Sequence, residues 1–162
     1  MIIFGIDPGS EKTGYGVVEK RSRSKLVCLA YGCIITPRTK SRAERLLFLE
    51  KELSSLLSHT KPDVGAVESL FFFKNLKTVM PVSEARGIAL FALAKHKIPV
   101  YEFSPLQIKM AIAGHGRAEK GQVQRMVKEI LCLEKIPKPD DAADGLAAAI
   151  TCSLVLRSLP QA

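Results

Sequence analysis

The sequence lacks the features of disulfide-rich, metal-finger and membrane proteins. Its four cysteines, Cys28, Cys33, Cys132 and Cys152, lie in apolar surroundings without CxxC or zinc-finger spacing, which favours buried, reduced thiols. No apolar run approaches the roughly 20 residues that span a bilayer. No basic segment precedes the first apolar run, as it would in a signal peptide. We therefore expect a cytoplasmic protein that does not enter the membrane.

Acidic residues are in the minority. The chain carries 24 Lys and Arg against 16 Asp and Glu, which gives a net charge of +8. Such an excess is typical of proteins that bind a polyanion, either nucleic acid or an anionic membrane surface. A soluble protein can also be basic without such a partner, and composition leaves both interpretations open.

The length of 162 residues suits one domain with a substantial core, and 47% of the residues are hydrophobic. We find no internal repeat and no linker long enough to separate domains. The sequence therefore predicts a single domain over residues 1–157 and a short C-terminal tail over 158–162.

Periodicity and turn signals predict an α/β fold. Three strands, 1–7, 15–20 and 26–36, are joined by short polar turns, so we expect antiparallel hairpins. The elements expected after them are a helix from Ser41, a strand over 64–68, a long helix to about 96, a strand over 100–103, and helices from 104, over 122–133 and over 141–157. Hairpins followed by right-handed crossovers predict a mixed five-stranded sheet with helices on both faces.

The long helix before residue 96 contains the segment ARGIALFALA, which is apolar on nearly every face. A helix without a polar face must be covered on both sides. We expect the sheet to cover one side and a second subunit to cover the other. Arg86, within this segment, is expected to pair with Glu84 or Glu102.

Two predicted strands end on a carboxylate. The first runs into Asp7 in GIDPG, and the strand over 64–68 ends at Glu68. In an open α/β sheet, functional groups gather beyond the carboxyl ends of the strands. If these strands are parallel neighbours, both side chains lie at the same edge, although either acid alone could simply cap a turn.

A second pair of acids lies in the segment DDAADGLAAAI. Asp141 and Asp144 are three residues apart on a predicted helix and so share one face. A helix cap explains one acid in the first turn. It explains Asp144 less well, because the apolar residues that follow must pack against the sheet, and a carboxylate on a packed face needs a partner.

These four acids form a candidate metal site. Two like charges about 4 Å apart repel by roughly 4 kcal/mol at an effective dielectric constant of about 20. A cluster of them must therefore take up protons or bind cations. Oxygen ligands without thiolate or imidazole select Mg²⁺ or Mn²⁺, and two such ions suit phosphodiester hydrolysis. Structural acids remain the alternative on spacing alone.

At this point the sequence resembles the RuvC family of Holliday-junction resolvases. The matching segments occur in order along nearly the whole chain: GIDPGSEKTGYGVV, Glu68 followed by Phe71 and Lys74-Asn75, ARGIA, GHGRAEKGQVQRMV and DAADGLAAAIT. GIDPG alone is weak, because sugar-kinase and actin-like ATPases also contain it. The five segments together are specific.

The resemblance implies an RNase H-like fold and a homodimer that nicks two symmetry-related strands of a four-way DNA junction with Mg²⁺. It also implies that Mn²⁺ substitutes, that each site holds two ions, and that the enzyme works with the branch-migration motor complex of RuvA and RuvB. Asp7, Glu68, Asp141 and Asp144 fall on the catalytic, metal-binding carboxylates of the family. The last position is a histidine in some members.

The resemblance also implies residues that contact DNA. Phe71 falls on an aromatic that presses against a base, and Lys74 lies in the matched segment after it. Lys109 and Lys120 fall on basic residues near the scissile phosphate. With Arg117 they flank a glycine-rich loop that could bind phosphate, or could simply be solvated.

The sequence departs from the family pattern in three places. SLFFF replaces a single aromatic after the glutamate, His115 lies between two glycines, and the C-terminal tail is short and barely charged. Three alternatives remain: a sugar-kinase or actin-like phosphotransferase, which would need a second such domain, a junction-binding module without catalysis, and an RNA-processing nuclease of the same fold.

Overall fold

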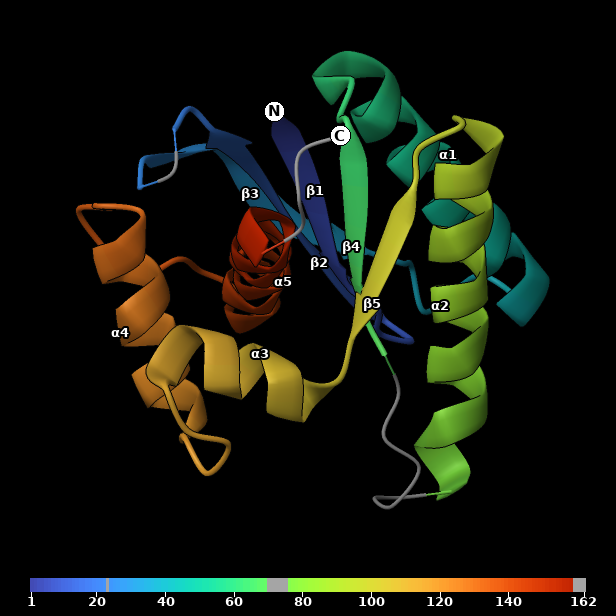
Figure 1. Ribbon diagram of the computed structural model, residues 1–162. Coiled ribbons are helices and arrows are strands. Elements are labelled where there is room, and N and C mark those ends of the chain that lie inside the picture. The colour runs from blue at the N-terminus through green and yellow to red at the C-terminus, as the bar shows by residue number, and fades with distance from the viewer. Residues whose placement is uncertain (23, 70–75, 159–162) are drawn as a thin grey trace.

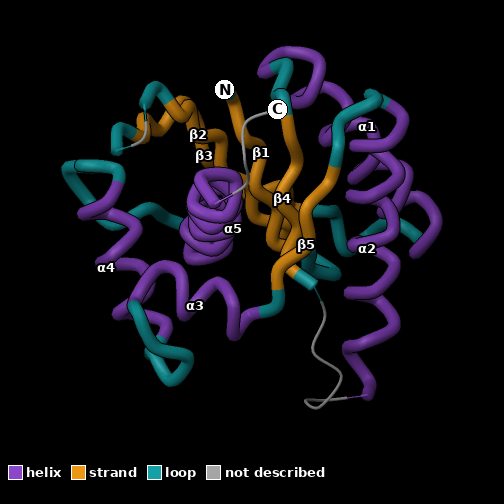
Figure 2. Tube along the Cα trace, viewed as in Figure 1, coloured by secondary structure: helices purple, strands orange, loops and turns teal. Residues whose placement is uncertain are grey.

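The computed structural model describes residues 1–22, 24–69 and 76–158; for residues 76–78 and 157–158 only the main chain is described. Within these residues the chain forms five strands and five helices (Figures 1 and 2). They are β1 (Ile2–Asp7), β2 (Lys12–Lys20), β3 (Leu26–Ile35), α1 (Arg42–Thr60), β4 (Val64–Glu68), α2 (Leu76–Lys95), β5 (Val100–Phe103), α3 (Pro105–Ala113), α4 (Lys120–Ile130) and α5 (Asp140–Ser158).

The strands form one mixed sheet in the order β3-β2-β1-β4-β5. The first three strands pair antiparallel as hairpins, whereas β1 with β4 and β4 with β5 pair parallel. The predicted α/β architecture is therefore confirmed. Since β1, β4 and β5 run in the same direction, their carboxyl ends share one edge of the sheet, the lower edge in Figure 1.

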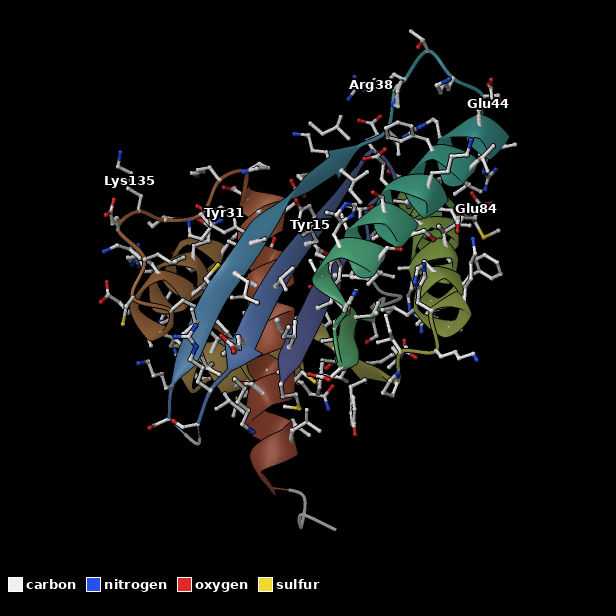
Figure 3. All side chains as sticks on the ribbon, turned by 90° about the horizontal axis from the view of Figure 1, so that it is seen from above. Tyr15, Tyr31, Arg38, Glu44, Glu84 and Lys135 are labelled. Atoms are coloured by element: carbon white, nitrogen blue, oxygen red, sulfur yellow. The ribbon has the colours of Figure 1, made fainter. Side chains whose placement is uncertain are left out.

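Helices cover both faces of the sheet. α1 and α2 lie on one face, while α5 lies on the other with α3 and α4 beyond it (Figure 1). The sheet thus separates two cores. One contains Phe4, Val17 and Leu53, and the other contains Val18, Leu146 and Ile150. In the first core the ring of Phe4 stacks on Tyr15, which is labelled in Figure 3, with ring centroids 5.8 Å apart.

Glycines let α5 approach the sheet at main-chain distance. A Cβ on Gly5 of β1 would lie 2.0 Å from the carbonyl oxygen of Gly145, and a Cβ on Gly14 of β2 would lie 1.8 Å from that of Asp141. Neither carbonyl can move without displacing the helix, so only glycine fits at these positions. The sequence therefore presses the first turns of α5 against the ends of β1 and β2.

Some details differ from the expectations. β2 begins at Lys12 rather than at residue 15, because Thr13 and Gly14 pair with β3. α4 spans Lys120–Ile130 rather than 122–133. Cys132, beyond the end of α4, has a left-handed φ of 51°.

The cysteines partly match the prediction. None of the four forms a disulfide. Cys152 is buried, and burial raises the pKa of its thiol to about 12. Cys28 and Cys33 are half-buried. The prediction of a buried thiol is wrong for Cys132, which is exposed because it follows the last turn of α4. In the part of the chain that the structure describes, we find no helix that could span a membrane.

Candidate active site

Three acids from distant parts of the chain line one cavity of about 270 Å³. Asp7 comes from the end of β1, Glu68 from the end of β4 and Asp144 from the second turn of α5. The other lining residues are Pro105, Ile108, Lys109, Lys120 and Val123, from α3 and α4. The cavity therefore combines three carboxylates, two lysines and an apolar wall.

The topology explains why these acids meet. Pairing of β1 with β4 runs to Ile6 opposite Val67, so Asp7 and Glu68 follow on neighbouring parallel strands. On the α5 side, a Cβ on Gly145 would lie 2.7 Å from the main chain of Tyr15. This close contact holds the adjoining Asp144 against the same edge.

The acids are close enough to affect one another's ionisation. Burial raises the pKa of Asp7 well above its ordinary value, and the charges of Glu68 and Asp144 raise it further. Burial, followed by the charge of Asp144, raises the pKa of Glu68 to about 7. Burial also raises the pKa of Asp144, against the opposing effect of Lys120. The cluster therefore has the repulsion that the sequence predicts.

Lysines supply the compensating charge. Nζ of Lys120 forms an ion pair with Oδ2 of Asp144 at 2.9 Å. Burial alone would lower the pKa of Lys120, but the hydrogen bond to Asp144 and the neighbouring acids give a net rise, so this side chain stays an ammonium. Lys109 of α3 is half-buried in the cavity wall, and its charge lowers the pKa of Glu68.

The donors suit a hard divalent cation, because all of them are carboxylate oxygens. Among residues 1–22, 24–69 and 76–158, no three His, Cys, Asp or Glu side chains lie close enough together to form a ready-made metal site. The ammonium of Lys120 is the cation placed against Asp144. The carboxylate donors thus suit Mg²⁺ or Mn²⁺. The distances between the acidic side chains in this structure are those of a cluster neutralised by lysine.

The remaining predicted residues fall into three groups. Asp141 is half-buried and its charge raises the pKa of Asp7, but it does not line the cavity. Arg117 is exposed in the connection between α3 and α4 and also does not line it. Phe71 and Lys74 lie outside the described residues. At His115, which departs from the family pattern, Nε2 lies 3.1 Å from Nε2 of Gln122.

The apolar wall of the cavity was not anticipated. Pro105, Ile108 and Val123 close one side of it. The helix expected from residue 104 contains Pro105, but only the family resemblance of Lys109 placed this helix near the acids. Of the two partners considered for Arg86, the structure selects Glu102, with which it forms an ion pair. Glu84 pairs instead with Arg42 of α1.

Comparisons with known proteins identify the family of the chain. The family model described as "Crossover junction endodeoxyribonuclease RuvC" matches residues 3–152. The RuvC protein of Petrotoga mobilis is 49% identical over 162 residues, covering 100% of this chain and 99% of the relative. That of Ruminiclostridium cellulolyticum is 51% identical over 150 residues, covering 93% and 90%.

A solved structure has the same fold. Thermus thermophilus RuvC in complex with a Holliday junction substrate aligns with a TM-score of 0.91 at 35% identity, covering 97% of this chain and 95% of that one. The mixed sheet and its flanking helices are thus those of an RNase H-like resolvase. With the matching family model and the close relatives, the conclusion follows that the chain belongs to the RuvC family of crossover junction endodeoxyribonucleases.

Proposed function

We propose that this protein resolves four-way DNA junctions by symmetric paired nicks, through metal-dependent hydrolysis of phosphodiester bonds, in homologous recombination and DNA repair. The observation that carries the proposal is the convergence of Asp7, Glu68 and Asp144 with Lys109 and Lys120 around one cavity. The family of the chain is one of divalent-metal nucleases that act on crossover junctions.

We assign the metal-holding role to Asp7, Glu68 and Asp144, with Asp141 beside them. Bound Mg²⁺ or Mn²⁺, two ions per site, would activate water and offset charge on the leaving oxygen. The protein itself contributes crowded carboxylates whose raised pKa values make them take up either protons or cations. Asp141 contributes charge near Asp7 and stands further from the cavity.

The lysines of the cavity bind and orient the substrate phosphate. Lys109 and Lys120 place two ammonium groups in the wall that also holds Glu68 and Asp144. Contact with a phosphate would draw Lys120 away from Asp144 and free that carboxylate. Arg117 in the exposed α3–α4 connection extends the positive surface beyond the cavity, and Phe71 and Lys74 remain predicted DNA contacts.

We further propose that the protein acts as a homodimer. On α2, Met80 is 63% exposed and Phe91 is 56% exposed, although Ala89 and Leu93 of the same helix are buried against the sheet. Exposed apolar residues of this size on one helix favour burial against a second copy. Two-fold symmetry would then present one site to each of two equivalent strands.

The remaining expectations rest partly on the family resemblance and partly on the length and composition of the chain. We propose that the nuclease works with the branch-migration motor complex of RuvA and RuvB. We also propose that residues 1–157 act as a single domain with 158–162 as a tail. A cytoplasmic location stays a prediction.

Asp7→Asn tests the proposal. Its amide keeps the shape of the side chain but removes a charge from the cavity, so we expect junction binding to persist or tighten while cleavage in Mg²⁺ disappears. Asp140→Asn is the matched control, because Asp140 is paired with Lys138 at the exposed start of α5 and does not line the cavity. It should cleave at the wild-type rate.

The substrates of this assay separate the alternatives. A synthetic four-way junction, a linear duplex and a folded RNA are compared in Mg²⁺. Paired symmetric nicks on the junction alone support the proposal. Equal cutting of linear duplex, preferential cutting of RNA, or retained cleavage by Asp7→Asn would reject it.

A further inference from the structure

The direction of Asp7 depends on the loop that follows it. β1 ends at Asp7 and β2 begins at Lys12, so residues 8–11 form the connection. Pairing of β1 with β4 stops at Ile6, which leaves the main chain of Asp7 paired only with Gly14 of β2. A shift of the loop would therefore move the carboxylate of Asp7.

Thr36 and Arg45, which we refer to as the loop clamp, bond to the main chain of this loop from the α1 face. Arg38 pairs with the side chain of Glu11, and the Thr13 hydroxyl donates to the carbonyl oxygen of Gly9 at 3.2 Å. The N–H of Thr36 donates to the carbonyl oxygen of Glu11 at 2.9 Å, and its hydroxyl lies 3.3 Å from the same oxygen. Arg45 donates to Oγ1 of Thr36 from Nε at 3.1 Å and from Nη2 at 2.9 Å. Nη2 of Arg45 also donates to the carbonyl oxygen of Ser10.

Charge pairing does not account for the position of Arg45. Its neighbours Arg38 and Arg42 pair with Glu11 and Glu84, respectively. For Arg45, no ion pair is found within the described ranges 1–22, 24–69 and 76–158. Instead, this half-buried guanidinium bonds to a hydroxyl and a main-chain carbonyl. A hydroxyl and a carbonyl compensate poorly for the water that a guanidinium loses on burial. The half-buried position of Arg45 therefore points to a role for its bonds to the loop.

A cavity of about 200 Å³ adjoins the clamp. Ser10, Thr36, Arg42 and Arg45 are among the residues that line it, with Pro81 and Glu84 of α2 opposite. Because this space is already open and partly polar, shortening Arg45 would enlarge an existing cavity rather than leave a new void in a core. The fold is therefore expected to survive removal of the side chain.

We propose that Arg45 is a positioning residue of the nuclease site, which fixes Asp7 through Ser10, Thr36 and Glu11. The inference rests on the proposed function of the Asp7 cavity. A misplacement of about 1 Å at a reacting group can cost on the order of 100-fold in rate. Loss of the clamp therefore lowers the rate of cleavage more than the affinity for the junction, because the clamp lies on the face of the sheet opposite α5.

The test compares Arg45→Ala with Arg42→Ala. Both variants remove one positive charge from the same helix and the same cavity, but Arg42 contacts Glu84 and not the loop. In single-turnover cleavage in Mg²⁺, Arg45→Ala is expected to be about 10- to 100-fold slower than wild type. Its junction Kd, measured in Ca²⁺, should stay within about 2-fold. Arg42→Ala should match wild type in both measurements.

Chemical rescue distinguishes positioning from general destabilisation. Guanidinium ion at low millimolar concentration can enter the cavity opened by Arg45→Ala and bond to Ser10 and Thr36. It should restore part of the cleavage rate of this variant and leave Arg42→Ala unchanged. Equal rates in the two alanine variants, or a slow Arg45→Ala that guanidinium does not rescue, would overturn the proposal.

Two further measurements cover the other outcomes. If Arg45→Ala does not fold, Arg45→Lys decides: its single ammonium reaches fewer acceptors, so an intermediate rate supports the clamp and a wild-type rate overturns it.

If wild-type protein leaves junctions uncut, the proposed function fails, and the clamp is tested by amide hydrogen exchange at Gly9, Ser10 and Glu11. Faster exchange in Arg45→Ala supports the clamp, and unchanged exchange overturns it.

Discussion

Replacing Glu68 with Gln should stabilise the metal-free protein above neutral pH. Burial and the charge of Asp144 raise the pKa of Glu68 from its ordinary value of 4.5 to about 7 in the folded state. Between these two pH values the folded protein binds more protons than the unfolded chain. Stability must therefore fall as the pH rises through this window, and the loss is complete above the folded pKa.

The size of the effect follows from the pKa. Each unit of pKa corresponds to about 1.4 kcal/mol, so ionisation of Glu68 lowers the free energy of unfolding by up to about 3 kcal/mol at pH 8. In a domain of this length, that is a change of roughly 6–12 °C in Tm. Glu68→Gln removes the titrating group, so its Tm should match wild type near pH 5 and exceed it at pH 8.

The assay is thermal unfolding followed by circular dichroism from pH 5 to pH 8 in EDTA. Glu134→Gln, an exposed glutamate in the connection between α4 and α5, serves as the control and should keep the pH slope of wild type. Added Mg²⁺ should raise the wild-type Tm most at pH 8, where the acids are ionised. A Glu68→Gln protein with the wild-type slope, or with a lower Tm at pH 8, would refute the reasoning.

Two further predictions concern the contact between α5 and the sheet, and the lysine of the cavity. Gly5→Ala places a Cβ 2.0 Å from a main-chain oxygen of α5 and should cost about 3 kcal/mol or more in urea unfolding. Gly121→Ala on α4, where the nearest side-chain neighbour of the added Cβ is the flexible end of Arg125 at 3.6 Å, should instead stabilise by up to about 1 kcal/mol, and equal effects would contradict the close-approach argument. Lys120→Gln removes the partner of Asp144, so the pKa of Asp144 should rise and cleavage should slow by about 10- to 100-fold. NMR titration of the carboxyl carbons measures this pKa, and an unchanged Asp144 pKa would contradict the role of the ion pair.

Local sequence rules were sufficient for the sheet and for the positions of three of the four predicted acids. Short polar turns predicted the hairpins, and right-handed crossovers then place β4 beside β1. Asp7 and Glu68 follow from this order, because strand direction and strand adjacency together fix where a strand-end side chain lies. Helical spacing also placed Asp144 on the packed face of α5.

Contacts between distant elements could not be read from the sequence. Nothing local to Lys120 indicates that its ammonium reaches Asp144, and nothing local to Arg45 indicates a bond to the loop after Asp7. Both contacts depend on how a helix is rotated and how closely it packs. The glycines at positions 5 and 14 carried a signal that was missed, since a residue without a side chain in a buried strand indicates close approach of another main chain.

Helix α5 carries part of the proposed cutting machinery on its first two turns and a wholly buried segment, residues 145–153, directly after them. A molecule in which this helix detaches loses one of its two cores, together with Asp141 and Asp144. The lysines and arginines on the other elements would remain in such a molecule. We therefore expect damage at this helix to abolish cleavage while much of the basic surface persists.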